Sequence, residues 1–162
     1  MTEGESPALT PTARAHLKGA SCHPHGHLSG SVSKRLLRAM FDAGYIYRED
    51  LDGFRLEGEA ALTYDKLTPW RITVSGRRAV LTPSQVNALV DRVGLEGRFA
   101  AQVTWSTTRS LAELRLAEYR DADRVVQPND GDDGVRGPRN SAYRTSLGDA
   151  VAELAASREG RA

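Results

Sequence analysis

The sequence SVSKRLLRAMFDAGYI, residues 31–46, decides the fold of the first half of the chain. Its apolar residues recur with the period of an α-helix, Ser31 suits the N-cap, and Gly44 suits the position after the last turn. The apolar stripe consists of Val32, Leu36, Ala39, Met40 and Ala43, widened by Leu37 and Phe41. Lys34, Arg35 and Arg38 fall on the opposite arc. We therefore expect a helix over residues 31–43 with one buried side and one exposed basic side.

Helix and strand patterns continue on both sides of this segment. Thr10-Pro11 predicts the start of a helix that runs to Lys18. Short strands are expected at residues 45–47, 54–56, 70–74 and 102–105. Thr82-Pro83 repeats the Thr-Pro start before a helix over residues 84–93, and a further helix is expected over residues 110–121. The sequence shows no internal repeat of the length found in solenoid proteins.

Two segments taken together resemble the winged helix-turn-helix regulators. SVSKRLLRAMFDAGYI is similar to their recognition helix with its closing turn. WRITVSGRRAV, residues 70–80, is similar to their last wing strand followed by a Thr-x-x-Gly-Arg turn. The resemblance covers about residues 8–81 and implies an α+β fold with a DNA-binding winged-helix domain.

The remaining sequence is divided by composition. We predict a disordered N-terminus over residues 1–7, the winged-helix domain over 8–81 and a helical extension over 82–126. Residues 127–162 are predicted to be a disordered acidic linker and tail with a short helix over 146–157. The two extension helices carry many apolar residues, and two interpretations stay open. Either these helices pack on the winged domain, or they form the interface of a homodimer.

The bulk composition narrows the classes of function. The 162 residues carry a net charge of +1, and 27% of them are charged. No apolar run approaches the ~20 residues of a membrane-spanning helix, and a single cysteine forms no intrachain disulfide. We therefore expect a cytoplasmic protein with no membrane partner. No phosphate-binding loop, nucleophile elbow or carboxylate pair is present, so we expect no enzyme activity and no cofactor.

The expected partner of the basic helix is double-stranded DNA. The major groove admits one α-helix, arginine can bind a guanine edge, and cations neutralise phosphates. The residues expected to contact DNA from this helix and its N-terminus are Ser31, Ser33, Lys34, Arg35 and Arg38. Further candidate contacts to the DNA backbone are Arg14, Lys18, Arg71, Arg77 and Arg78. These assignments lead to our first hypothesis, a sequence-specific transcriptional regulator of the kind a phage or mobile element carries.

Two alternatives rest on other parts of the sequence. Residues 49–65 hold six carboxylates against Arg55 alone, which phosphates would repel. The second hypothesis is therefore a winged-helix module that binds a protein instead of DNA. The third is a metal-responsive sensor, in which the metal ligands come from Cys22, His23, His25 and His27. The plainer alternative for this loop is a turn that binds no metal.

Overall fold

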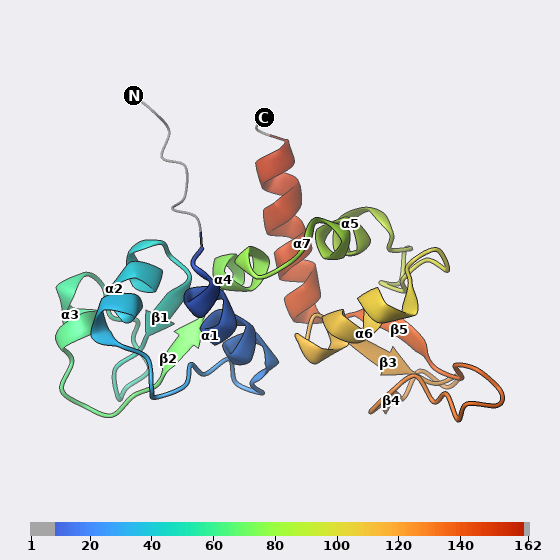
Figure 1. Ribbon diagram of the computed structural model, residues 1–162, viewed down its shortest axis with the longest axis horizontal. Helices are drawn as coiled ribbons and strands as arrows, with labels where there is room; N and C mark the ends of the chain where they lie inside the picture. Colours follow the sequence, from blue (N-terminus) through green and yellow to red (C-terminus); the bar gives the residue numbers. More distant parts are fainter. Residues whose placement is uncertain (1–8, 161–162) are drawn as a thin grey trace. The chain divides into compact units, whose positions relative to one another are not determined.

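The computed structural model describes residues 9–160, which divide into two compact units after residue 80. The described residues form a mixed α+β protein with seven helices and two small antiparallel sheets (Figure 1), in agreement with the predicted α+β class. The predicted disordered N-terminus, residues 1–7, lies outside the described residues.

The first unit is a small sheet with helices around it (Figure 1). Its elements are α1 (Pro11–Cys22), α2 (Lys34–Asp42), β1 (Ile46–Arg48), α3 (Glu59–Thr63), β2 (Trp70–Ile72) and α4 (Val74–Ala79). β1 and β2 pair antiparallel, with Ile46 opposite Ile72. Leu17, Met40 and Ile46 are almost completely buried and form the centre of the core.

The second unit is also built from helices around a sheet. Its elements are α5 (Pro83–Asp91), α6 (Trp105–Glu113), β3 (Ala117–Arg120), β4 (Val126–Gln127), β5 (Ser141–Arg144) and α7 (Ser146–Glu159). β3 is the central strand, antiparallel to both β4 and β5. The predicted helical extension and disordered tail are therefore replaced by one compact unit, because β3 pairs with β5 from the segment predicted to be tail.

Several predicted element boundaries are wrong. α2 begins at Lys34 with Ser33, not Ser31, as its N-cap. α1 continues past Lys18 to Cys22. The strand expected at residues 102–105 does not form. The helix expected at 110–121 divides into the end of α6 and strand β3, because Arg115 adopts a positive φ of 63° that ends the helix.

The second helix is α2 in the first unit and α6 in the second, and the turn that follows it is the same in both units. Gly44 (φ 78°) and Arg115 (φ 63°) occupy it, 71 positions apart in sequence. In the first unit the next N–H, of Tyr45, donates to Met40 O at 2.9 Å. In the second unit the corresponding bond runs from Leu116 N to Leu111 O, also at 2.9 Å. The exit from the helix into the strand is thus built twice with the same hydrogen bond.

A threonine after the last strand is held in the same way in both units. The N–H of Thr73 donates to Tyr45 O (2.9 Å), and its hydroxyl donates to Gly44 O (2.7 Å). Seventy-two positions later, Thr145 donates to Leu116 O (3.1 Å) and, through its hydroxyl, to Arg115 O (2.8 Å). Each threonine also caps the helix that follows it, α4 or α7. The last strand, the turn and the final helix are therefore joined by equivalent bonds.

A segment before the second helix of each unit, bonded to the last strand through an isolated β-bridge, completes the correspondence. In the first unit, Ile72 N donates to Gly26 O, and Leu28 N donates to Trp70 O. In the second unit, Arg144 N donates to Gly97 O and Phe99 N donates to Ala142 O. Both units also begin with a Thr-Pro helix start, at Thr10 and Thr82. We call residues 9–80 the first repeat and residues 81–160 the second repeat, because both contain the same motif of helix, bridged segment, helix, strand pair and final helix.

One glycine in each repeat sits against the turn after the second helix. A Cβ atom on Gly76 would lie 2.3 Å from Tyr45 O, and one on Gly148 would lie 2.2 Å from Leu116 O. Real Cβ atoms essentially never approach so closely, so only glycine lets the final helix pack here. The Thr-x-x-Gly pattern at residues 73–76 and 145–148 is thus a packing requirement of the motif.

Substituting either glycine by alanine should destabilise only the repeat that contains it. We expect Gly76→Ala and Gly148→Ala each to cost ~2 kcal/mol or more, because backbone must move to admit the methyl group. Trp70 lies in the first repeat and Trp105 in the second, so urea unfolding followed by fluorescence in Trp→Phe backgrounds reports on each repeat separately.

Gly19→Ala is the matched control for these variants. Gly19 lies inside α1, and nothing would contact its Cβ within 4 Å. Alanine there should stabilise the first repeat by ~0.5–1 kcal/mol through its better helix propensity. Equal effects of the three substitutions on unfolding would contradict the packing argument.

Candidate nucleic-acid interface

α2 presents a cationic surface in the first repeat. Ser33 caps the helix by accepting a hydrogen bond from Leu36 N (3.3 Å), which fixes where the first turn begins. Lys34, Arg35 and Arg38 are exposed, while Met40 on the opposite side is buried. Within residues 9–160, Lys34 and Arg35 have no ion-pair partner. The structure therefore brings together the three cations that the sequence placed on one side of the helix.

Arg38 is already bound by a carboxylate. Its Nη1 and Nη2 donate to the two oxygens of Glu59 at 3.1 and 2.8 Å. This hydrogen-bonded charge pair lowers the pKa of the Glu59 carboxyl and raises that of the Arg38 guanidinium. Glu59 begins α3 in the β1–β2 connection, residues 49–69. This pairing could not be predicted from the sequence, because 21 positions separate the two residues.

Arg48 fixes the β1–β2 connection. Its guanidinium donates to the carbonyls of residues 61, 64, 66 and 68 at 2.6–3.2 Å. It also lies over the rings of Tyr64 and Trp70, 5.3 and 5.7 Å from their centroids. One side chain thus satisfies a series of carbonyls in a segment with little regular structure, and holds α3 opposite α2. Between them lies a cleft of about 720 Å³.

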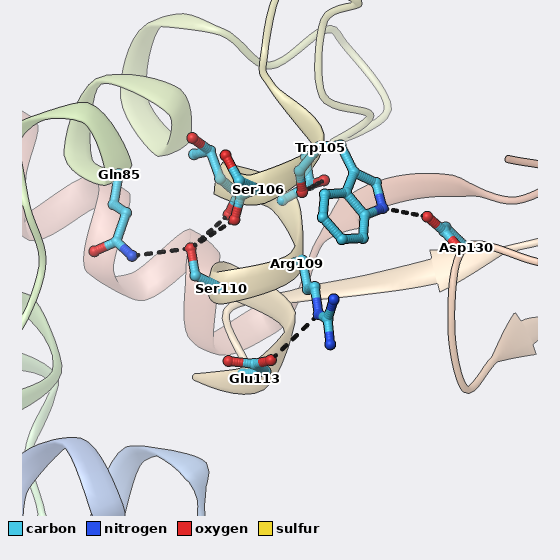
Figure 2. Close-up of polar contacts among 9 residues, drawn as sticks. Gln85, Trp105, Ser106, Arg109, Ser110, Glu113 and Asp130 are labelled. Carbon is cyan, nitrogen blue, oxygen red and sulfur yellow. Dashed lines mark hydrogen bonds and ion pairs between the residues drawn. The ribbon is translucent and has the colours of Figure 1, made fainter. Parts of the chain in front are cut away.

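The equivalent helix of the second repeat, α6, has a different surface (Figure 2). Positions 34, 35 and 38 correspond to Trp105, Ser106 and Arg109, so one cation remains of three. Trp105 is 51% exposed, and its indole N–H donates to Asp130 in the β4–β5 connection, residues 128–140. Arg109 stacks over the Trp105 ring at 5.0 Å and pairs with Glu113 at 3.5 Å.

Hydroxyl groups join α6 to α5 within the second repeat (Figure 2). Gln85 Nε2 donates to Ser110 Oγ at 3.1 Å, and that hydroxyl donates to Ser106 O at 3.0 Å. The apolar sides of both helices are covered inside the repeat, where Leu89 and Leu111 are at most 1% exposed. The side chains on which the homodimer interpretation rested are therefore used in the core of the second repeat.

The five further candidate contacts differ in accessibility. Arg77 is only 6% exposed and donates to the carbonyl and hydroxyl of Ser21 at 3.1 and 3.2 Å, so its assignment as a DNA contact is wrong. Arg71 pairs with Glu49 at 3.7 Å. The remaining three are Arg14 and Lys18, which are exposed, and Arg78, which is half-buried.

In the histidine loop, residues 23–27, the three imidazole rings lie close together. His23 and His27 stack, with centroids 4.7 Å apart and planes inclined by 17°, and His25 lies 6.0 and 5.7 Å from them. His23 Nδ1 accepts hydrogen bonds from the N–H groups of His25 and His27, so the lone pair of this nitrogen is already used within the loop. In the described part of the chain, no group of three or more His, Cys, Asp or Glu side chains is arranged to hold a metal ion. The candidate ligands, including Cys22 at the end of α1, do not form a metal centre here.

Burial and neighbouring charges act on His27. Desolvation is the largest cause that lowers its pKa below 6.5, followed by charge repulsion from His23, Arg71 and His25. Its Nε2 is buried with no hydrogen-bond partner among the described residues. Protonation of His27 is therefore unfavourable in the folded first repeat.

Comparison of the chain with protein-family models, with curated proteins and with solved structures finds no match. None of the helices within residues 9–160 combines the length and apolar character needed to cross a membrane.

Acidification should destabilise the first repeat selectively. Because His27 has a lower pKa in the folded state, the unfolded chain binds more protons below pH 6.5, and the free energy of unfolding decreases as pH falls. We expect the urea midpoint reported by Trp70 to fall as pH is lowered from about 7.5 to about 5.5, the range in which an unperturbed histidine titrates.

The second repeat provides the internal control, since all four histidines precede residue 28. The midpoint reported by Trp105 should stay constant over the same range, and His27→Gln should flatten the response of the first repeat. A pH response that survives His27→Gln would rule out this origin.

Proposed function

We propose that the chain is a sequence-specific DNA-binding regulator and that its first repeat is a winged-helix domain. In this proposal α2 enters the major groove, where Lys34 and Arg35 contact the duplex and Ser31 and Ser33 lie near phosphates. The cations at positions 34 and 35 are exposed and unpaired among the described residues, so DNA binding requires no prior bond to be broken at either position.

The comparison of the two repeats is the observation that carries this proposal. Both repeats hold the same backbone bonds, yet the exposed positions equivalent to Lys34 and Arg35 are Trp105 and Ser106 in α6. The motif therefore folds without cations at these positions. The fold therefore does not require the two unpaired cations on α2. Neutralising DNA phosphates is a function that exposed cations of this kind can perform.

The β1–β2 connection sets how the duplex approaches. This segment, residues 49–69, carries six carboxylates against Arg55 and Lys66, so phosphates are repelled there. Glu59 also neutralises Arg38 at the side of α2 nearest to α3. In the proposed complex the N-terminal turn of α2 therefore contacts the duplex first. Arg38 contacts DNA only after its ion pair with Glu59 breaks.

A protein-interaction module is the second candidate, favoured by the same connection. Leu51, Phe54 and Leu67 are exposed there beside the carboxylates. A basic, partly apolar protein surface would suit this combination. The variant Phe54→Ser distinguishes the two candidates, because it should leave DNA affinity unchanged while weakening the binding of a protein partner.

Removing the two unpaired cations should weaken DNA binding. For Lys34→Ala/Arg35→Ala we expect at least about tenfold lower affinity for genomic duplexes, and a slope of log K against log salt reduced by about 1.8, because two phosphate contacts are lost. Fluorescence polarisation at several salt concentrations measures both quantities.

The second repeat supplies the matched control for this measurement. Arg109→Ala removes a cation at the position equivalent to Arg38 and should leave affinity within about twofold, since that side chain is engaged by Trp105 and Glu113. If Arg109→Ala weakened binding as much as the α2 double variant, the proposed interface would be wrong.

Releasing Arg38 should strengthen DNA binding. Glu59→Gln removes the carboxylate partner and one negative charge near α2, so we expect affinity to rise by about threefold, the scale of an exposed ion pair. The double variant Glu59→Gln/Arg38→Ala should lose this gain. A lower affinity for Glu59→Gln would contradict the proposed role of the pair.

A further inference from the structure

The cleft between α2 and α3 has the size and lining of a small-molecule site. Its volume of about 720 Å³ falls within the range of ligand pockets. Tyr64, Trp70 and two leucines, Leu37 and Leu62, contribute apolar surface. On the α2 side, three cations line the cleft beside Leu37: Lys34, Arg35 and Arg38. The cleft therefore combines aromatic walls with a row of cations.

The charges that line this cleft are unbalanced. Among the described residues, Glu59 is the one carboxylate in the lining, and Arg38 binds it. Lys34 and Arg35 remain uncompensated, and Arg48 is bonded to main-chain carbonyls, not to a carboxylate. An anion is thus favoured in the cleft, and the two-bond geometry of Arg38 with Glu59 shows that a carboxylate fits opposite α2.

The second repeat has a cleft at the equivalent place with the opposite charge. It lies between α6 and the β4–β5 connection, measures about 470 Å³ and is lined by Trp105, Arg109, Asp130 and Asp132 among others. Asp130 accepts the indole N–H of Trp105, so connection and helix are already joined there. The cleft itself therefore follows from the motif, whereas the positive lining is particular to the first repeat.

We propose that the α2–α3 cleft binds a small organic anion with an aromatic or other flat apolar body. Its acidic group contacts Lys34 and Arg35, and its ring lies against the exposed parts of Tyr64 and Trp70. Because these cations are the proposed DNA contacts, the anion competes with DNA and would act as an effector. Competition between the anion and DNA rests on the proposed function, whereas binding of the anion to the cleft is independent of it.

The binding test uses the full chain carrying Trp105→Phe, which leaves Trp70 in the cleft as the single tryptophan. Phenylacetate, phenyl phosphate and the neutral 2-phenylethanol are titrated separately while Trp70 emission is recorded without DNA. We expect saturable millimolar binding of at least one anion, at least about tenfold tighter than 2-phenylethanol, because two charge-assisted contacts are available. The two anions distinguish a carboxylate site from a phosphate site.

Two variants separate the cleft from nonspecific binding. Lys34→Ala/Arg35→Ala should remove the preference for anions, while Lys18→Ala, which removes an exposed cation on α1 outside the cleft, should keep it. Equal responses to all three compounds, no saturable response to either anion, or an anion preference that survives the double variant would overturn the site.

A competition arm keeps this inference distinct from the proposed function. With duplex DNA present, the anion that binds should raise the apparent Kd for DNA of the chain but not that of Lys34→Ala/Arg35→Ala. Anion binding without any DNA binding would refute the regulator and leave the site standing. DNA binding with no anion response would refute the site alone.

Discussion

The close approach of a glycine to a main-chain carbonyl is the constraint on which both repeats depend. Gly76 lies against Tyr45 O and Gly148 against Leu116 O, with no room for a Cβ atom in either case. This contact positions the final helix, and the preceding threonine bonds the last strand to the same turn. The second helix, the hairpin and the final helix are thereby fixed as a group, which leaves the outer surface of the second helix free to vary.

The two repeats use this freedom differently. In the first repeat, α2 carries unpaired cations and faces a connection fixed by Arg48. In the second repeat, α6 carries Trp105, which is bonded to its own connection. One motif thus presents a cationic helix beside an aromatic cleft in one copy and a helix of nearly balanced charge in the other. Because the two repeats share one backbone motif, a comparison between them shows what the surface side chains of each repeat contribute.

The sequence predicted local structure better than long-range contacts. The periodicity of residues 31–43 located α2 and its exposed cations, and Thr-Pro pairs located α1 and α5, because these signals lie within a few residues. The strand β5 was missed, because its pairing with β3 joins residues more than 20 positions apart. Glu59 was missed as the partner of Arg38 for the same reason. The repeat was hidden by divergent side chains, although Leu-Thr-Pro at residues 9–11 and 81–83 and Thr-x-x-Gly at residues 73–76 and 145–148 were visible in the sequence.

Hydrogen–deuterium exchange of the full chain, with and without duplex DNA, tests the central claim most directly, since it compares two helices of the same backbone design in one sample. We predict slower exchange on DNA binding in peptides that cover residues 31–45 and unchanged exchange in the equivalent residues 102–116. Protection of the second segment in place of the first, or of neither in a complex that demonstrably forms, would contradict the assignment of α2 as the DNA-contacting helix.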